Sequence, residues 1–411
     1  MISTNSSHSL CELPVRSPGE LAHANSRPTP RLAVIWIDWY AYHIARFRAL
    51  VRHPELEHRI VGIELVGGAG VHGKWKFRSE DREDLPITTL VPDRGWSEVG
   101  QRTVTRQLWR KLNELNPDAV LIPGYYTLPA LGATLWARIR GKRVILMSES
   151  TRQDHSRKWF VEALKRTVLS RLFHGAISGG KRTRAYLREL GFPEAEIAGL
   201  YDVVDNEFFS EQTARVRERR SRASLGLPEN YFLYVGRMAP EKNVDGLIRA
   251  FARYRQAGGT WSLVLVGDGP LTAHLLQETR ERGLTDAVHF AGLKDTSAIA
   301  PYYAFASCFV LASAREPWGL VVNEAMAAGL PLIVSDRCGC VDDLLEHGRN
   351  GFRYDFSAGD EQLQNLLSRF SALGENERRR MSQISKDIIS KYSPELWAEE
   401  VVRIAGIKSI S

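Results

Sequence analysis

The chain has 411 residues, of which 44% are hydrophobic and 25% charged, and its formal net charge is +7. Such a composition is typical of a globular protein with two or three domains. The longest apolar runs are too short for a transmembrane helix. The polar residues 1–30 lack the apolar segment of a signal peptide, so we expect a disordered tail there. The excess of positive charge favours an anionic partner, such as a nucleotide, an acidic glycan or an anionic lipid surface.

The four cysteines indicate a reducing compartment. Cys338 and Cys340 are separated by one glycine, which is closer than the two-residue spacing of a zinc knuckle. Cys11 lies in the expected tail and Cys308 in an apolar run. We therefore expect reduced thiols and a cytoplasmic protein.

From residue 31 onward, apolar runs alternate with amphipathic stretches. In the first half we expect strands at residues 32–37, 59–65, 87–91, 119–122, 143–147 and 175–178, with a short strand near 197. Helices are expected near residues 42–51, 98–115, 128–140, 157–173 and 181–190. Strands that alternate with helices of this length predict a parallel sheet with crossover helices. Residues 31–209 are thus expected to form one Rossmann-like domain, which binds the acceptor.

The alternation restarts after a charged stretch, so residues 210–228 are expected to be a linker. Strands follow at residues 231–235, 262–266, 288–290, 308–311 and 331–334, with helices at 244–255, 271–282 and 320–328. Three more helical stretches end the chain. We expect a second Rossmann-like domain at residues 229–391 and a final helix in 392–411 that packs back on the first domain. Two parallel sheets that face each other create a cleft at the carboxyl ends of their strands.

The first candidate site loop follows the strand at residues 231–235. Gly236 allows the chain to turn out of the strand. Arg237 and Lys242 bracket a short loop, so both cations can point at one place above the sheet edge. Two cations beside a helix start suit a diphosphate, although the same residues also suit a solvated turn.

Two further loops carry weaker signals. Gly269 belongs to the segment Gly267-Asp268-Gly269-Pro270, in which glycines allow a ligand to approach the backbone closely. Gly292 and Leu293 follow the next strand. Each of these loops alone is also compatible with an ordinary turn.

The strongest element runs from Glu316 to Pro331. Pro317 and Gly319 mark a turn that opens a helix, and Glu324 lies about one and a half helical turns further on. The free N–H groups of Gly319 and Leu320 would stabilise an anion at the helix start. A carboxylate accepts hydrogen bonds from vicinal hydroxyl groups. One glutamate is therefore expected to hold a ribose and the other a hexose, with a diphosphate between them.

These motifs together resemble those of the retaining glycosyltransferases of family 4, the glycosyl transferases group 1. The match covers most of residues 229–391 and rests on three motifs: Gly236-Arg237-Met238 with Glu241-Lys242-Asn243, the segment from Val266 to Pro270, and the pair Glu316 and Glu324. The resemblance implies the GT-B fold, an α/β fold of two Rossmann-like domains that face each other across a cleft. It also implies that the donor is a nucleotide-diphosphate sugar.

The resemblance implies a role for each matching position. Arg237 and Lys242 would neutralise the departing diphosphate, which is the main catalytic task. Glu316 would hold the hexose and Glu324 the ribose. The N–H groups of Gly319 and Leu320 would contact the phosphates, Gly269 would approach the donor, and Gly292 and Leu293 would lie near the base. Transfer would proceed with retention and without a metal, because cationic side chains serve the diphosphate; Asp342 and Asp343 are expected to cap a helix.

The first half departs from the family pattern in three places. The usual Gly-Gly loop after the first strand is replaced by the segment 38–43, an Asn-Gly pair by Asp202-Val203, and an expected histidine by Glu149-Ser150. Asp38, His43 and Glu149 are the acceptor-side candidates. For each of them the residue pattern favours a solvated or structural role over a catalytic one.

The first half is also strongly basic. Residues 138–188 contain 14 Lys and Arg residues against three acidic ones. Phe160, Leu164, Val168 and Leu172 recur every four residues, which indicates a basic amphipathic helix. Its apolar stripe is expected to pack on the sheet, while the surrounding charge would attract the anionic inner face of the plasma membrane or a lipid-linked acceptor.

Three functions remain open at this point. The first is a retaining hexosyltransferase acting on a glycan or lipid-linked acceptor, for example in bacterial surface polysaccharide synthesis. The second is another enzyme on the same scaffold, such as a nucleotide-sugar epimerase or a glycan phosphorylase, and the third is a non-catalytic nucleotide-sugar binding protein. Nucleic acid is not an expected partner, because no recognition helix or basic-aromatic motif occurs.

Overall fold

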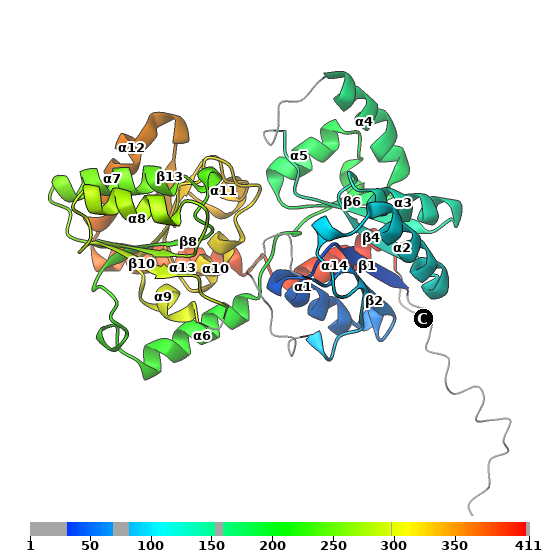
Figure 1. The fold of residues 1–411 in the computed structure, drawn as a ribbon, viewed down its shortest axis with the longest axis horizontal. Helices are drawn as coiled ribbons and strands as arrows, with labels where there is room; N and C mark the ends of the chain where they lie inside the picture. The colour runs from blue at the N-terminus through cyan, green and yellow to red at the C-terminus, as the bar shows by residue number, and fades with distance from the viewer. Residues whose placement is uncertain (1–30, 69–81, 153–158, 297, 408–411) are drawn as a thin grey trace, which may run out of the picture.

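The computed structural model describes residues 31–68, 82–152, 159–296 and 298–407. They form two α/β domains that stand side by side (Figure 1), and each is built on one sheet. The tail expected at residues 1–30 lies outside the described residues. Among the helices in these ranges, none combines the length and the apolar content that crossing a bilayer requires.

The sheet of the first domain has seven parallel strands in the order β3-β2-β1-β4-β5-β6-β7. The strands are β1 (Leu32–Trp36), β2 (Ile60–Val66), β3 (Ile87–Val91), β4 (Ala119–Pro123), β5 (Arg143–Ser148), β6 (Gly175–Ser178) and β7 (Ile197–Ala198). The central strands are apolar along their length because helices cover both faces of the sheet. The strand order reverses between β1 and β4, and ligands of such sheets bind at this point.

Two sets of helices cover the first sheet. One face carries α2 (Gln101–Leu115), α3 (Leu128–Ile139), α4 (Trp159–Leu172) and α5 (Lys181–Glu189). The other face carries α1 (Ala41–Arg52) and α14 (Pro394–Ala405), the last helix of the chain. Trp397 and Val401 of α14 are fully buried in this second core. The end of the chain therefore completes the first domain.

The second domain repeats this design with six parallel strands in the order β10-β9-β8-β11-β12-β13. The strands are β8 (Tyr231–Val235), β9 (Ser262–Val266), β10 (Val288–Gly292), β11 (Cys308–Leu311), β12 (Leu332–Ser335) and β13 (Gly351–Tyr354). The helices are α7 (Val244–Gln256), α8 (Thr272–Glu281), α9 (Ala300–Phe305), α10 (Leu320–Ala327), α11 (Val341–Leu344), α12 (Gly359–Ser371) and α13 (Glu375–Ile389). Strand β13 was not expected from the sequence, because its four residues are too few to show a strand pattern.

The linker prediction for residues 210–228 is wrong for most of its length. Helix α6 (Asn206–Arg219) occupies it and packs on α9 and α10 of the second domain. The Asp205 side chain caps the helix by accepting from the N–H of Phe208 at 2.9 Å. Arg217 donates to the carbonyl groups of Ala304 at 2.8 Å and Ala328 at 3.1 Å. The charged residues that suggested a linker thus anchor a helix.

Helix α4 also differs from the expectation for its apolar stripe. Leu164 and Val168 are exposed, with 64% and 37% of their surface open to solvent. Leu169, which lies off the expected stripe, is buried against the sheet instead. The stripe was expected to pack on the sheet, but the helix is rotated so that part of it faces outward.

Candidate active site

The candidate site lies at the carboxyl ends of the strands in the second sheet, where the strand order reverses between β8 and β11. Two glycines bring the first loops together here. A Cβ atom on Gly267 would lie 1.9 Å from the carbonyl oxygen of Gly236, so no side chain fits at this position. The loops after β8 and β9 are therefore held in contact by backbone packing.

Lys242 and Glu316 form an ion pair at the centre of the site. The loop with Lys242 is fixed to the segment after β11, because the carbonyl group of Glu241 accepts from the N–H groups of Ala314 and Arg315 at 2.9 and 3.1 Å. Only 10% of the Glu316 side chain and 21% of the Lys242 side chain are exposed. The structure thus brings together two of the three residues to which the sequence assigned the chemistry.

Arg237 is not joined to this pair. Its guanidinium lies 3.5 Å from the carboxylate of Glu241, and 46% of its side chain is exposed. The sequence suggested that Arg237 and Lys242 point at one place, but in this state Arg237 faces a neighbour in its own loop. A diphosphate could still draw it away, because the pair with Glu241 is exposed and weak.

Glu324 lies on α10 and is almost fully buried. Its carboxylate accepts a hydrogen bond from the hydroxyl group of Tyr303 at 2.6 Å and another from Tyr42. Tyr42 belongs to α1, so this second bond crosses from the first domain to the second. Burial raises the pKa of Glu324 to about 7, although both tyrosine hydrogen bonds act in the opposite direction. The charge of Glu316 also acts on Tyr42, so this tyrosine lies close to both glutamates.

The start of α10 is positioned by a glycine and an asparagine. Gly319 precedes the helix with a φ of +103°, which only glycine adopts without strain. Asn323 accepts from the indole N–H of Trp318 at 2.9 Å and donates to the carbonyl of Asp202 at 3.0 Å. These two bonds hold the helix start, with the N–H groups of Gly319 and Leu320, against the segment that joins the domains.

The weaker glycine positions divide into two kinds. The N–H of Gly269 is engaged by the side chains of Asp268 and Thr272 at 2.8 and 2.9 Å, so packing within the loop accounts for this residue. Gly292 ends β10 with a φ of +72° and open space around it. Leu293 follows it at the same edge and is partly exposed. These two positions can still contact a ligand.

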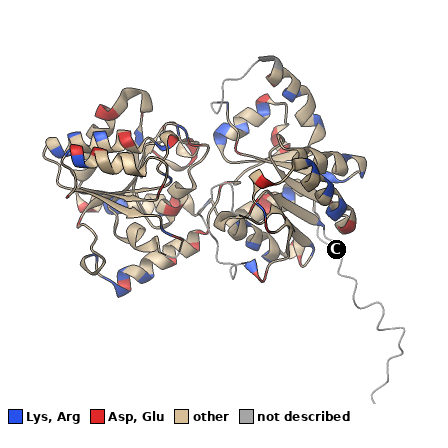
Figure 2. Ribbon diagram, in the orientation of Figure 1, with Lys and Arg blue, Asp and Glu red and all other residues tan. Residues whose placement is uncertain are grey.

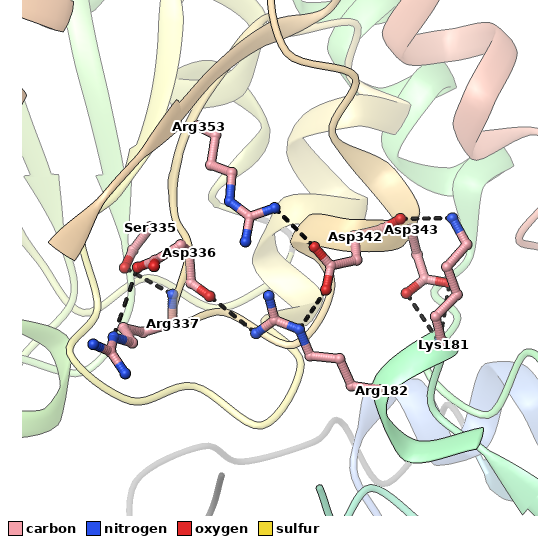
Figure 3. Close-up of polar contacts among 8 residues, drawn as sticks. All are labelled: Lys181, Arg182, Ser335, Asp336, Arg337, Asp342, Asp343 and Arg353. Carbon is pink, nitrogen blue, oxygen red and sulfur yellow. Dashed lines mark hydrogen bonds and ion pairs between the residues drawn. The ribbon is translucent and has the colours of Figure 1, made fainter. Parts of the chain in front are cut away.

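A polar junction closes one side of the site (Figure 3). Arg182 of α5 donates to Asp342 at 2.6 Å and to the carbonyl of Asp336 at 2.9 Å. The N–H of Lys181 donates to Asp343 at 3.1 Å. The two aspartates were expected to cap a helix, but they lie in the first turn of α11, whose N-cap Cys340 makes no side-chain cap, and they bind the first domain instead. Arg182 and Thr151 from the first domain, together with Arg315, Glu316 and Arg337 from the second, line a cavity between the domains.

Two acceptor-side candidates have local structural roles. The Nδ1 atom of His43 accepts from the N–H of Tyr40 at 3.1 Å, and its ring stacks on Trp36 with 4.6 Å between centroids. Burial, followed by the charge of Arg46, lowers the pKa of His43 well below its usual value, so the imidazole is neutral. Asp38 accepts from the hydroxyl of Tyr40 at 2.7 Å.

The third candidate, Glu149, is exposed and hydrogen-bonded to the buried Asp202. No N–H group in the described part of the chain donates to Asp202. Burial, and then the charge of Glu149, raise the pKa of Asp202 well above its usual value. Burial thus favours the protonated form of Asp202, whose carboxyl group can then donate to Glu149. These are two of the positions at which the first half departs from the family pattern, and the structure places them in contact.

Sequence reasoning missed Tyr42, Tyr303, Asp202 and Arg182. Each acts on the site through a partner that is distant in the sequence, so no local motif marks it. Tyr42 and Asp202 lie at two of the departures from the family pattern, and those departures were the available signal.

Two facing Rossmann-like domains with a site at the second sheet define the GT-B fold, as the sequence predicted. The solved structure of the Anabaena protein HepE in complex with UDP and glucose has this fold. It matches with a TM-score of 0.69 and 16% sequence identity, over 91% of this chain and 98% of that one.

Residues 217–387, which include most of the second domain, match the model of the family Glycosyl transferases group 1. The N-acetyl-alpha-D-glucosaminyl L-malate synthase of Bacillus anthracis is 27% identical over 212 residues, which are 50% of this chain and 54% of that protein. The GDP-mannose-dependent alpha-(1-6)-phosphatidylinositol monomannoside mannosyltransferase of Mycobacterium tuberculosis is 28% identical over 231 residues, or 53% and 58%. The chain thus matches little more than half the length of these relatives.

Proposed function

We propose that the protein is a retaining glycosyltransferase that transfers a hexose from a nucleotide-diphosphate sugar to a glycan or lipid-linked acceptor. The observation that carries the proposal is the placement of Lys242, Glu316 and Glu324 around the start of α10. A cation, a helix start and two carboxylates at one place suit a diphosphate with a sugar on each side. UDP and glucose bound to HepE support a donor of this kind.

In this proposal the second domain holds the donor. Lys242, with Arg237 released from Glu241, neutralises the diphosphate, and Glu316 binds hexose hydroxyl groups next to the anomeric carbon. Glu324 accepts from the two ribose hydroxyls, which replace the hydroxyl of Tyr42. The N–H groups of Gly319 and Leu320 bind the phosphates, and the edge formed by Gly292 and Leu293 lies beside the base.

The catalytic task is to stabilise the diphosphate as it leaves the sugar. We propose that the new bond forms on the face from which the diphosphate departs, so that the anomeric configuration is retained. Cationic side chains serve the leaving group, and no metal is required. Glu149 and Asp38 stand on the acceptor side of the cleft, where the hydrogen bond from Asp202 to Glu149 would let Glu149 bind an acceptor hydroxyl.

The acceptor is proposed to be a glycan or a lipid-linked sugar in surface polysaccharide synthesis. The names of the two curated relatives describe different acceptors, malate and a phosphatidylinositol mannoside. The acceptor is therefore set by the first domain, which differs most from the family pattern. Its basic surface supports an anionic acceptor and a location at the inner face of the plasma membrane.

The test begins with thermal unfolding in the presence of UDP, GDP and ADP and their sugars. A ligand at 100 times its dissociation constant stabilises the protein by about 2.7 kcal/mol. Release of the nucleoside diphosphate from the best donor is then measured for Glu316→Gln and Lys242→Ala. Glu316→Gln should lower turnover about 100-fold to 1000-fold while nucleotide binding changes little. Lys242→Ala should weaken binding of the nucleoside diphosphate.

Glu377→Gln, an exposed glutamate on α13, is the matched control and should leave both measurements unchanged. Turnover of Glu316→Gln at the parent rate would refute the assigned role. A donor sugar that isomerises without release of the diphosphate would indicate an epimerase. Nucleotide-sugar binding without any turnover across a panel of acceptors would indicate a binding protein.

A further inference from the structure

The exposed apolar side chains of this protein are concentrated in one place. Seven of the eight large apolar side chains that are exposed in the described residues lie between residues 126 and 168, on α3 and α4 or just before α3. On α3 they are Leu128, Leu131, Leu135 and Ile139, and on α4 they are Leu164 and Val168. We call these six residues the apolar surface. Single exposed apolar residues are ordinary, but such a group marks an interaction site.

The spacing on α3 shows that this is one face of a helix. Residues 128, 131, 135 and 139 follow one another by three or four positions and so line one side. The opposite side, with Ala130, Ala133 and Ala137, is buried against the sheet. Helix α3 is thus apolar both on the side that faces the sheet and on the side that faces solvent. Ile139 has 65% of its surface exposed, so the described part of the chain does not cover it.

The neighbouring helix α4 extends the same surface. Lys165 of α4 lies over the ring of Tyr125, just before α3, at 5.8 Å. Arg138 of α3 and His174, just after α4, are in contact at 2.8 Å between ring nitrogen and guanidinium. The two helices therefore approach each other at two points, and Leu164 and Val168 are exposed on α4.

Arginines border the apolar surface on both sides. Arg102, Arg106 and Arg110 recur every four residues on the exposed side of α2. This helix packs tightly on α3, since a Cβ atom on Gly132 would lie 2.5 Å from Thr105. Arg166 and Arg171 are exposed on α4. We call these five residues the basic border, and Figure 2 shows basic residues along these helices.

Acidic residues do not offset this border. Helix α3 contains none. On α2, Glu114 pairs with Lys111, and on α4, Glu162 pairs with Lys165 and accepts from Tyr186. Each of the three helices α2, α3 and α4 therefore carries more basic than acidic residues.

We propose that the apolar surface and the basic border together seat the first domain on an anionic lipid bilayer. Leucine and isoleucine would enter the boundary between headgroups and acyl chains, while the arginines bind anionic headgroups beside them. Two copies of the chain would not fit this surface as well, because a symmetric contact would place arginines against arginines. A soluble polyanion would satisfy the arginines but leave the apolar side chains in water.

The placement has a consequence for the acceptor. Helix α3 follows β4, so its start lies at the carboxyl edge of the first sheet, where the cleft opens. A bilayer seated on α3 would therefore reach the rim of the cleft near Tyr126, which is 78% exposed. The inference is independent of donor binding, because it rests on a different face of the molecule.

The test is co-sedimentation of the full chain with vesicles of neutral phosphatidylcholine or of phosphatidylcholine mixed with phosphatidylglycerol. The apolar variant carries Leu131→Gln, Leu135→Gln and Ile139→Gln, since glutamine keeps the helix propensity. Its control is Leu396→Gln, the one exposed large apolar residue on α14, on the other face of the sheet. The charge variant carries Arg102→Gln, Arg106→Gln and Arg110→Gln. Its control carries Arg219→Gln, Arg379→Gln and Arg380→Gln.

We expect the parent to bind anionic vesicles at least tenfold better than neutral ones. The charge variant should lose about fivefold in partitioning for each arginine, and the apolar variant at least tenfold in all, with both controls unchanged. Circular dichroism melting shows whether each variant is folded. Equal binding to neutral and anionic vesicles, or a folded apolar variant that binds like the parent, would overturn the proposal. So would a parent dimer in sedimentation that the apolar variant converts to a monomer, because a second copy would then cover the surface.

Discussion

The two domains have the same strand order, but they contribute to the site in different ways. In the second domain, bonds within the domain position the site residues, as Lys242 does with Glu316 and Tyr303 with Glu324. The first domain contributes through contacts across the cleft, as Tyr42 does with Glu324 and Arg182 with Asp342. The proposed donor site is therefore held mainly by bonds within the second domain, whereas the first domain reaches it through contacts across the cleft.

The largest expected effect concerns the point at which the two halves are joined. Asn323→Ala removes a buried side chain that bonds both Trp318 and the carbonyl of Asp202. Two buried polar groups lose their partner, at about 1–3 kcal/mol each. We expect the free energy of unfolding to fall by about 3 kcal/mol in urea titrations. Asn113→Ala is the control, because it also loses a bond to a tryptophan, Trp136, but Asn113 itself is exposed and the bond is only partly buried. An equal loss of unfolding free energy in both variants would show that the bonds of Asn323 stabilise the protein no more than the bond of Asn113 does.

The second prediction concerns how the affinity for the nucleoside diphosphate changes with pH. It tests donor binding separately from the contact between the domains. Because burial raises the pKa of Glu324 to about 7, the carboxyl is mostly neutral at pH 6 and mostly ionised at pH 8. Ribose hydroxyls donate to the ionised form, so affinity for the nucleoside diphosphate should rise about tenfold between these pH values. Titration calorimetry measures this change. The difference between the parent and Glu324→Gln isolates the effect from titration of the phosphate itself.

A smaller effect is expected when the contact across the cleft is removed. Tyr42→Phe deletes a hydroxyl that bonds Glu324 only while no ribose is bound, so nucleotide should bind more tightly, by about threefold to tenfold. Tyr303→Phe deletes a bond inside the second domain and should leave affinity unchanged or weaker. If Tyr42→Phe weakened binding as much as Tyr303→Phe does, the tyrosine would belong to the donor site itself.

The smallest effect is expected at the polar junction. Burial tends to raise the pKa of Asp342, but the hydrogen bonds and charges of Arg182 and Arg353 outweigh it, and the pKa lies below its usual value. The bridge is therefore present at neutral pH and lost as the pH falls through that lowered value. Arg182→Gln should change the free energy of unfolding by less than about 1 kcal/mol yet enlarge the radius of gyration in X-ray scattering. Arg353→Gln, which binds Asp342 within one domain, should not enlarge it.

The sequence predicted the GT-B fold and the grouping of Lys242 and Glu316 near the start of α10, and the reason is local. Gly319, Leu320 and Glu324 belong to one turn and helix, so their spacing along the chain fixes their spacing in space. The ion pair of Lys242 and Glu316 was predictable because both follow neighbouring strands of one sheet. The orientation of the Arg237 side chain was not predictable, since Glu241 of the same loop competes for it with a ligand.

The sequence did not predict the contacts that join distant segments. Tyr42 and Glu324 are 282 residues apart, and their bond depends on how the two domains face each other. Helix α6 was mistaken for a linker because its stability comes from carbonyl groups on α9 and α10 that accept from Arg217, and not from an apolar stripe. Which residues of α4 face solvent could not be predicted either, because this depends on which of its apolar side chains pack against the sheet.

Helix α14 has a consequence for how the protein is made. It adds Trp397 and Val401 to the core of the first domain, but it is synthesised only after all the strands of the second domain. The second domain can therefore finish folding while the first still lacks part of its interior. Until α14 docks, the first domain exposes an unfilled apolar groove.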